Sequence, residues 1–137
     1  MGHSYNNGLH TTSKGVTYDV LRVNHLDTTT PDVLEDCKSG LVSSCAHTAD
    51  TGIYTFQLSL PYPPKLVVCQ PSISCAAVTS EQIAPRYKTD SYDATAGTFV
   101  VFLLDDDDAG AGVAASDAKI GSTAELHLVL AFNRYTA

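Results

Sequence analysis

The chain has 137 residues, enough for one domain with a single hydrophobic core. It carries 15 acidic and 8 basic residues, and the formal net charge of −7 argues against binding to a nucleic-acid phosphate backbone. Apolar residues make up 44% of the chain and charged residues only 17%, which excludes a disordered, highly charged segment.

Neither a secretory signal nor a membrane span is predicted. The first 30 residues contain no apolar run of seven and no positively charged leading region. The longest apolar run, Phe99 to Leu104, has six residues and is far too short to span a bilayer. We therefore expect a soluble protein that is made and used without crossing a membrane.

Residues 1–39 are predicted to form an N-terminal arm and a connector. Gly2 to Gly15 consists mainly of turn and loop formers and has little capacity to fold alone. Alternation over Val16 to Leu21 indicates a first strand. One short helix is predicted over 31–38, because Thr30 suits its cap, Pro31 its first position and Gly40 its end.

Residues 40–137 show an alternation of period two that predicts a β-sandwich domain. Prolines over 61–64 and at position 71 are expected to end strands, and 105–121 is expected to be a loop. Turn formers at 48–52 and 93–97 separate two pairs of strands. The strands are expected at 41–47, 53–60, 65–70, 72–79, 86–92, 98–104 and 124–135.

The last of these strands has a competing interpretation. Ser122 and Glu125 have the spacing of a helical capping box. Alternating large apolar residues favour a strand instead, with Leu126, Leu128, Leu130 and Phe132 facing inward and Glu125, His127 and Asn133 outward. The predicted fold class is therefore all-β, an antiparallel sandwich or jelly-roll-like fold with an extended N-terminal arm and one short helix.

The four cysteines, Cys37, Cys45, Cys69 and Cys75, match neither C-x-x-C redox pairs nor zinc ribbons. Reduced, buried thiols are the preferred interpretation. A zinc site that uses Cys45 and His47, and a disulfide, remain alternatives. The run Asp105–Asp108 lacks the spacing of an EF-hand loop, so we interpret it as a solvated acidic turn, with calcium binding as its alternative.

No arrangement of residues indicates catalysis. The histidines His3, His10, His25, His47 and His127 stand in no nucleophile-elbow or zinc-protease motif. Glu35, Glu81 and Glu125 lie on separate predicted elements, and nothing in the sequence pairs them for carboxylate catalysis. We therefore predict a protein that is not an enzyme and has no catalytic, cofactor-binding or metal-binding residues.

Several phrases of the sequence resemble small virion proteins of tailed bacteriophages, notably capsid decoration (cement) proteins. The resemblance covers about residues 40–137 and rests on hairpin phrases: Thr51 to Leu60, Lys65 to Val68, Ser91 to Val100 and Ala124 to Asn133. It implies a structural protein that binds the outside of the assembled head and bridges neighbouring capsomers. The implied partner is the major capsid protein, and the implied location is the virion surface after assembly in the bacterial cytoplasm.

The resemblance also implies a homo-oligomer, a trimer in preference to a dimer, with no nucleic-acid or membrane partner. Two alternatives stay open: a tail or fibre component with a receptor-binding or glycan-binding face, and a small cytoplasmic lectin or enzyme. Two strands that are apolar at nearly every position, Leu66 to Val68 and Phe99 to Leu104, are expected to share their faces with a neighbouring protomer. The predicted partner-binding residues are Tyr5, Asn6, Leu9 and His10 in the arm, and Tyr62.

Overall fold

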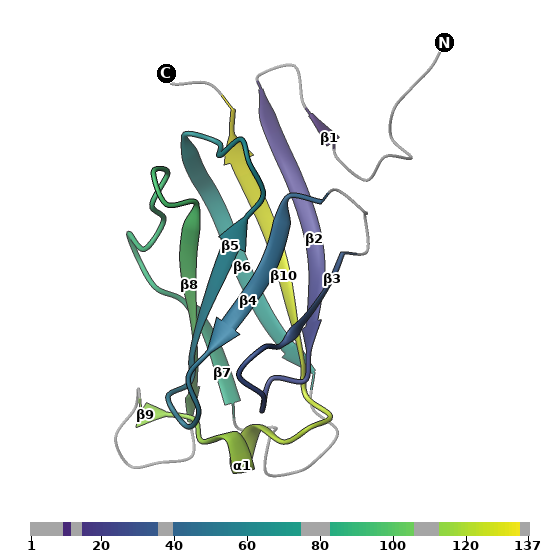
Figure 1. Cartoon of the computed structure of the whole chain (residues 1–137), viewed down its shortest axis with the longest axis vertical. Helices are drawn as coiled ribbons and strands as arrows, with labels where there is room; N and C mark the ends of the chain where they lie inside the picture. Colours follow the sequence, from purple (N-terminus) through teal and green to yellow (C-terminus); the bar gives the residue numbers. More distant parts are fainter. Residues whose placement is uncertain (1–9, 12–14, 36–39, 75–82, 106–112, 135–137) are drawn as a thin grey trace.

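A computed structural model of the protein describes residues 10–11, 15–35, 40–74, 83–105 and 113–134. Two antiparallel β-sheets pack face to face over one hydrophobic core, with a short helix at one end (Figure 1). The protein is an all-β sandwich, which confirms the predicted fold class.

Sheet A is centred on β2 (Val16–Asn24) and β10 (Glu125–Asn133). β10 pairs with β2 on one side and with β6 (Lys65–Ser74) on the other. The other edge of β2 carries β1 (His10–Thr11) beside its first half and β3 (Asp32–Glu35) beside its second half. Strands from the two ends of the chain thus lie side by side in the middle of this sheet.

Sheet B has the strand order β4 (Val42–His47), β5 (Ile53–Leu58), β8 (Thr98–Asp105) and β7 (Ile83–Tyr87). β9 (Val113–Ala114) pairs with the end of β8 and leads into α1 (Asp117–Ile120). Because α1 has only four residues, no helix in the described part of the chain is long and apolar enough to cross a membrane.

Alternation along the strands places the large apolar side chains of both sheets in the shared core. On β10, Leu126, Leu128, Leu130 and Phe132 are fully buried, as predicted. Sheet B contributes Tyr54, Phe56 and Phe99, and the last two stack with ring centroids 5.0 Å apart. Burial of each such side chain stabilises the fold by about 1.5–3 kcal/mol.

The helix predicted over 31–38 is wrong in its described part, because residues 32–35 form strand β3, and residues 36–38 lie outside the described residues. The segment pairs with β2 from Leu21–Glu35 to Asn24–Asp32, and Val33 packs against the core. Two helical turns gain little on their own because helix nucleation is costly, whereas the edge of β2 offers a ladder of backbone partners. The sandwich therefore includes residues 16–35 and does not begin at residue 40.

Pro71 does not end a strand as predicted, since β6 continues through it to Ser74. β6 pairs only with β10 in sheet A, so it is an edge strand, and an edge strand tolerates a residue that lacks an N–H. The loop predicted over 105–121 is also corrected, because it contains β9 and α1.

The predicted turn at 93–97 is confirmed. Asp93 Oδ1 accepts hydrogen bonds from the backbone amides of Thr95 and Ala96 at 2.8 and 3.0 Å. Gly97 follows with a φ of 71°, and the ring of Tyr62 lies directly against it. Tyr62 thus covers the end of the sandwich where β5 leaves it.

A first prediction concerns Gly52 and Gly40, whose φ angles are +62° and +67°. A Cβ at Gly52 would lie 2.4 Å from the carbonyl oxygen of Leu103, whereas a Cβ at Gly40 would meet no heavy atom of the described residues within 4 Å. Gly52→Ala should therefore lower the free energy of unfolding by about 1–3 kcal/mol more than Gly40→Ala. Urea denaturation measures both losses, and equal losses would contradict the expectation.

Candidate functional site

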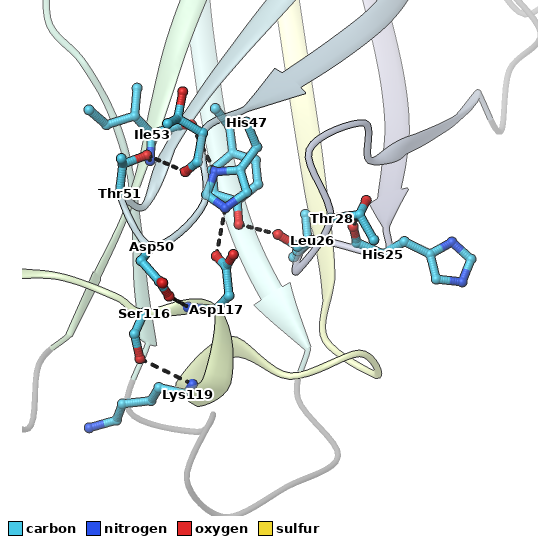
Figure 2. A network of polar contacts seen from close by, with 12 residues as sticks. His25, Leu26, Thr28, His47, Asp50, Thr51, Ile53, Ser116, Asp117 and Lys119 are labelled. Carbon is cyan, nitrogen blue, oxygen red and sulfur yellow. Dashed lines mark hydrogen bonds and ion pairs between the residues drawn. The ribbon is translucent and has the colours of Figure 1, made fainter.

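Polar side chains gather around His47, at the end of the sandwich that carries α1 (Figure 2). The His47 side chain is fully buried, with Nε2 2.7 Å from Asp117 Oδ1 and Nδ1 3.1 Å from the backbone oxygen of Ile53. A carboxylate and a carbonyl oxygen both accept hydrogen bonds, so both ring nitrogens donate. Both ring nitrogens of His47 are therefore engaged with oxygen acceptors, and neither is free to act as a general base.

The surrounding contacts join three segments of the chain. The ring of His47 stacks on Tyr54 at 4.2 Å with an interplanar angle of 5°, and the Tyr54 hydroxyl donates to the carbonyl oxygen of Leu26. The backbone amide of Asp117 donates to Asp50 Oδ1 at 3.0 Å. Burial, and then the negative charge of Asp117, raise the pKa of Tyr54, which keeps its hydroxyl protonated as a donor. This network is a structural tie between the β4–β5 turn, α1 and the β2–β3 connection.

A second polar cluster lies on the outer face of sheet A. His127 Nε2 is 3.3 Å from Ser74 Oγ and 3.4 Å from Glu125 Oε1, and Arg22 lies 3.7 Å from the same glutamate oxygen. A serine–histidine–carboxylate triad needs the hydroxyl and the carboxylate on different ring nitrogens. Here both approach Nε2, so the cluster lacks the geometry of a triad.

Asp105, the first residue of the acidic run, forms an ion pair with Lys119 at 2.7 Å. Asp106 to Asp108 lie outside the described residues, where the calcium alternative stays untested. In the described part of the chain, no group of three or more His, Cys, Asp or Glu side chains is placed to hold a metal ion.

Cys45 and Cys69 are free thiols, the first buried and the second half-buried. Burial raises the pKa of each thiol to about 12. Both are therefore protonated at neutral pH and poor nucleophiles. Cys37 and Cys75 lie outside the described residues.

The predicted partner-binding residues fall on separate elements. Tyr5, Asn6 and Leu9 lie outside the described residues. His10 belongs to β1, where its backbone pairs opposite Tyr18. Tyr62 is half-buried against Gly97, so only part of its ring is available to a partner.

Sequence reasoning missed two exposed apolar surfaces, one on each sheet. The outer patch lies on sheet A and consists of five side chains that are 38–52% exposed: Tyr18, Val20, Val67, Val68 and Val129. The sheet B groove is an open depression of about 310 Å³ lined by Thr51, Gly52, Ile53, Phe102, Leu104 and Ala114. The available signal was apolar residues at the outward positions of these strands, which sequence analysis noted only for Leu66 to Val68 and Phe99 to Leu104.

Comparison of the sequence with protein-family models finds no match, and comparisons with curated proteins and with solved structures find none either. The functional interpretation therefore rests on the surfaces and contacts described above.

A second prediction compares two histidine–aspartate pairs with the same 2.7 Å separation. The His47 side chain is fully buried, whereas His25 and Asp32 are 56% and 60% exposed. Asp117→Ala should lower the free energy of unfolding by about 1–3 kcal/mol, because it leaves a buried ring nitrogen of His47 without its hydrogen-bond partner. Asp32→Ala should cost less than about 1 kcal/mol, because water screens the exposed pair. Chemical denaturation of both variants at neutral pH checks this, and similar losses would show that burial does not set the strength of the pair.

A third prediction concerns thiol reactivity in a Cys37→Ser/Cys75→Ser variant, which retains Cys45 and Cys69. At pH 8 a thiol with a pKa of about 12 is deprotonated in roughly 1 molecule in 10⁴. Iodoacetamide should therefore label the folded variant far more slowly than the same variant in denaturant. Mass spectrometry over time follows the labelling, and equal rates in the two states would contradict the burial of these thiols.

Proposed function

We propose that the protein is a structural component of a virion: a decoration, or cement, protein that binds the outside of an assembled tailed-phage head. In this role it contacts the major capsid protein, bridges neighbouring capsomers and is itself a homo-oligomer. Binding only the assembled form of the shell stabilises that form by mass action. Assembly takes place in the bacterial cytoplasm, and the mature location is the capsid surface.

The observation that carries the proposal is the presence of two apolar surfaces on opposite sides of one sandwich. A bridging protein needs at least two contact surfaces, and these must not compete with each other. The outer patch faces away from the core on sheet A, and Ile53, Phe102 and Leu104 of the groove face away from it on sheet B. Contiguous exposed apolar surface of this kind marks interaction sites.

The polar groups support a binding role over a catalytic one. His47 is held between two acceptors, and His127 meets its serine and its glutamate through one nitrogen. Among the described cysteines, both thiols have raised pKa values and stay protonated. These groups hold strands together and leave no activated nucleophile paired with a base.

We assign shell binding to the sheet B groove because it offers a shaped apolar recess with cationic residues beside it. Arg86 pairs opposite Phe102 and is exposed, and Lys88 Nζ lies 5.9 Å from the centre of the Phe102 ring. An apolar side chain of the capsid surface fits such a recess, with an acidic neighbour beside the two cations. The N-terminal arm, with Tyr5, Asn6, Leu9 and His10, is a further proposed contact with the shell or a neighbouring subunit.

A fourth prediction tests shell binding with Ile53→Asp. Ile53 is 42% exposed in the groove, so the substitution should leave the fold intact and lower the affinity for shells at least about tenfold by placing a charge in an apolar contact. Cosedimentation with expanded heads of the encoding phage, freed of this protein, measures the binding. Ser44→Asp is the matched control, since it adds the same charge at an exposed position of β4 outside the groove.

If the wild-type protein fails to bind expanded heads, the decoration function is wrong. Equal binding by Ile53→Asp and Ser44→Asp would instead move the shell contact away from the groove. Copy number in purified virions separates the proposal from a tail or fibre role, because a decoration protein is abundant and a fibre component is present in few copies.

A further inference from the structure

We infer that the outer patch of sheet A is the contact surface for a second copy of this chain, packed face to face about a two-fold axis. This inference rests on the self-association contained in the proposed function and gives it a surface and a symmetry. Its test uses the purified protein alone, so it fails or succeeds independently of shell binding.

The strand register makes the patch continuous across three neighbouring strands. Val20 on β2 pairs opposite Val129 on β10, and one row further Tyr18, Ala131 and Val68 stand side by side on β2, β10 and β6. Val67 is the extra residue at the irregularity in β6 and is 52% exposed. Single exposed apolar residues are ordinary, but a block of neighbours over three strands marks an interaction surface.

The size of this face matches what a pair of copies requires. β2 has nine residues, and the sheet is four strands wide in the rows where β1 or β3 lies beside β2. Strand spacings of about 4.8 Å and a rise of about 3.3 Å per residue give a projected face on the order of 600 Å². The roughly 800 Å² that each partner contributes to a standard interface is of the same order, so the contact between two copies must use most of this face.

The charge distribution favours a copy of the same chain over a strongly charged partner. The chain carries a net charge of −7, which opposes association of two copies, and salt screens this repulsion only between charges that lie more than about 10 Å apart. A contact between copies therefore needs a surface that brings no like charges close together. The five residues of the outer patch are uncharged, and the far half of the same face carries both signs, in Arg22 and Glu125. A two-fold axis packs the apolar half of one copy against the apolar half of the other. The half that carries Arg22 and Glu125 holds both signs of charge, so the two copies can pair opposite charges there.

A contact of one patch with itself is isologous and closes as a dimer. It therefore selects the dimer over the trimer expected from the resemblance to decoration proteins. The two outer faces pack as sheets do within a sandwich, with side chains of both copies filling a layer about 10 Å thick.

The test is the oligomeric state of the full chain and two charge variants, measured by light scattering and sedimentation equilibrium from micromolar to submillimolar concentrations. Wild-type protein should be a dimer of the 14.5 kDa chain. Val129→Asp and Val20→Asp, at sites 42% and 38% exposed, should each raise the dimer dissociation constant at least about tenfold by placing like charges across the axis. Ser44→Asp on sheet B should stay dimeric, and circular dichroism confirms that each variant is folded.

A wild-type monomer throughout this range, or a trimer, overturns the inference. Dimers that persist in both folded patch variants overturn it too, because they place the contact on another surface. A dimer broken by Val129→Asp supports it even where shells are not bound, so the failure of the decoration function and the failure of this interface give different results.

Discussion

The antiparallel pairing of β2 with β10 joins the two ends of the chain over eight residue pairs, from Val23–Leu126 to Val16–Asn133. β10 also carries β6, and the free edge of β2 carries β1 and β3, so every strand of sheet A depends on this contact. Its inward side chains reach into the shared core and are fully buried. Bringing β2 and β10 together closes the long segment between them into a loop, which costs conformational entropy before any contact is gained. The many long-range residue pairs must therefore form together to offset this cost. The sandwich is therefore one cooperative unit that includes the early residues of the chain.

Burial decides what the charged and titratable groups of this protein do. His47 and Asp117 lie 70 positions apart in the chain, yet the packing of α1 against the β4–β5 turn brings them to hydrogen-bond distance. The stacked ring of Tyr54 and the carbonyl oxygen of Ile53 complete the enclosure of the His47 ring. The contact between His47 and Asp117 therefore serves to hold two segments of the chain together. Burial also sets the state of Cys45 and Cys69, because their apolar surroundings raise the pKa of each thiol and keep it protonated. The described polar groups of the interior thus act as ties between segments of the chain.

The two outer faces of the sandwich carry the apolar surfaces on which the proposed contacts rest. A solvated antiparallel sheet normally alternates between apolar and polar residues, with the polar side turned to water. Here valines and a tyrosine occupy outward positions on sheet A, and Ile53 and Phe102 do so on sheet B. Because the two surfaces point in opposite directions, one can serve contact between copies while the other meets a different partner. This division is the physical basis of the proposed bridging role.

Local pattern alone determined much of the fold. Alternation predicted strands over 53–60, 98–104 and 124–135, and these correspond to β5, β8 and β10. It also predicted which of their side chains face the core, because the period of a strand is a property of the chain itself. Tertiary structure decided the rest: residues 32–35, with local signals for a helix, became β3 because the edge of β2 supplied backbone partners. The passage of β6 through Pro71 depends on its edge position, which no local signal shows. The His47–Asp117 pair and the outer patch are likewise products of strand order and register, because burial and pairing between distant residues exist only once the sheets have assembled.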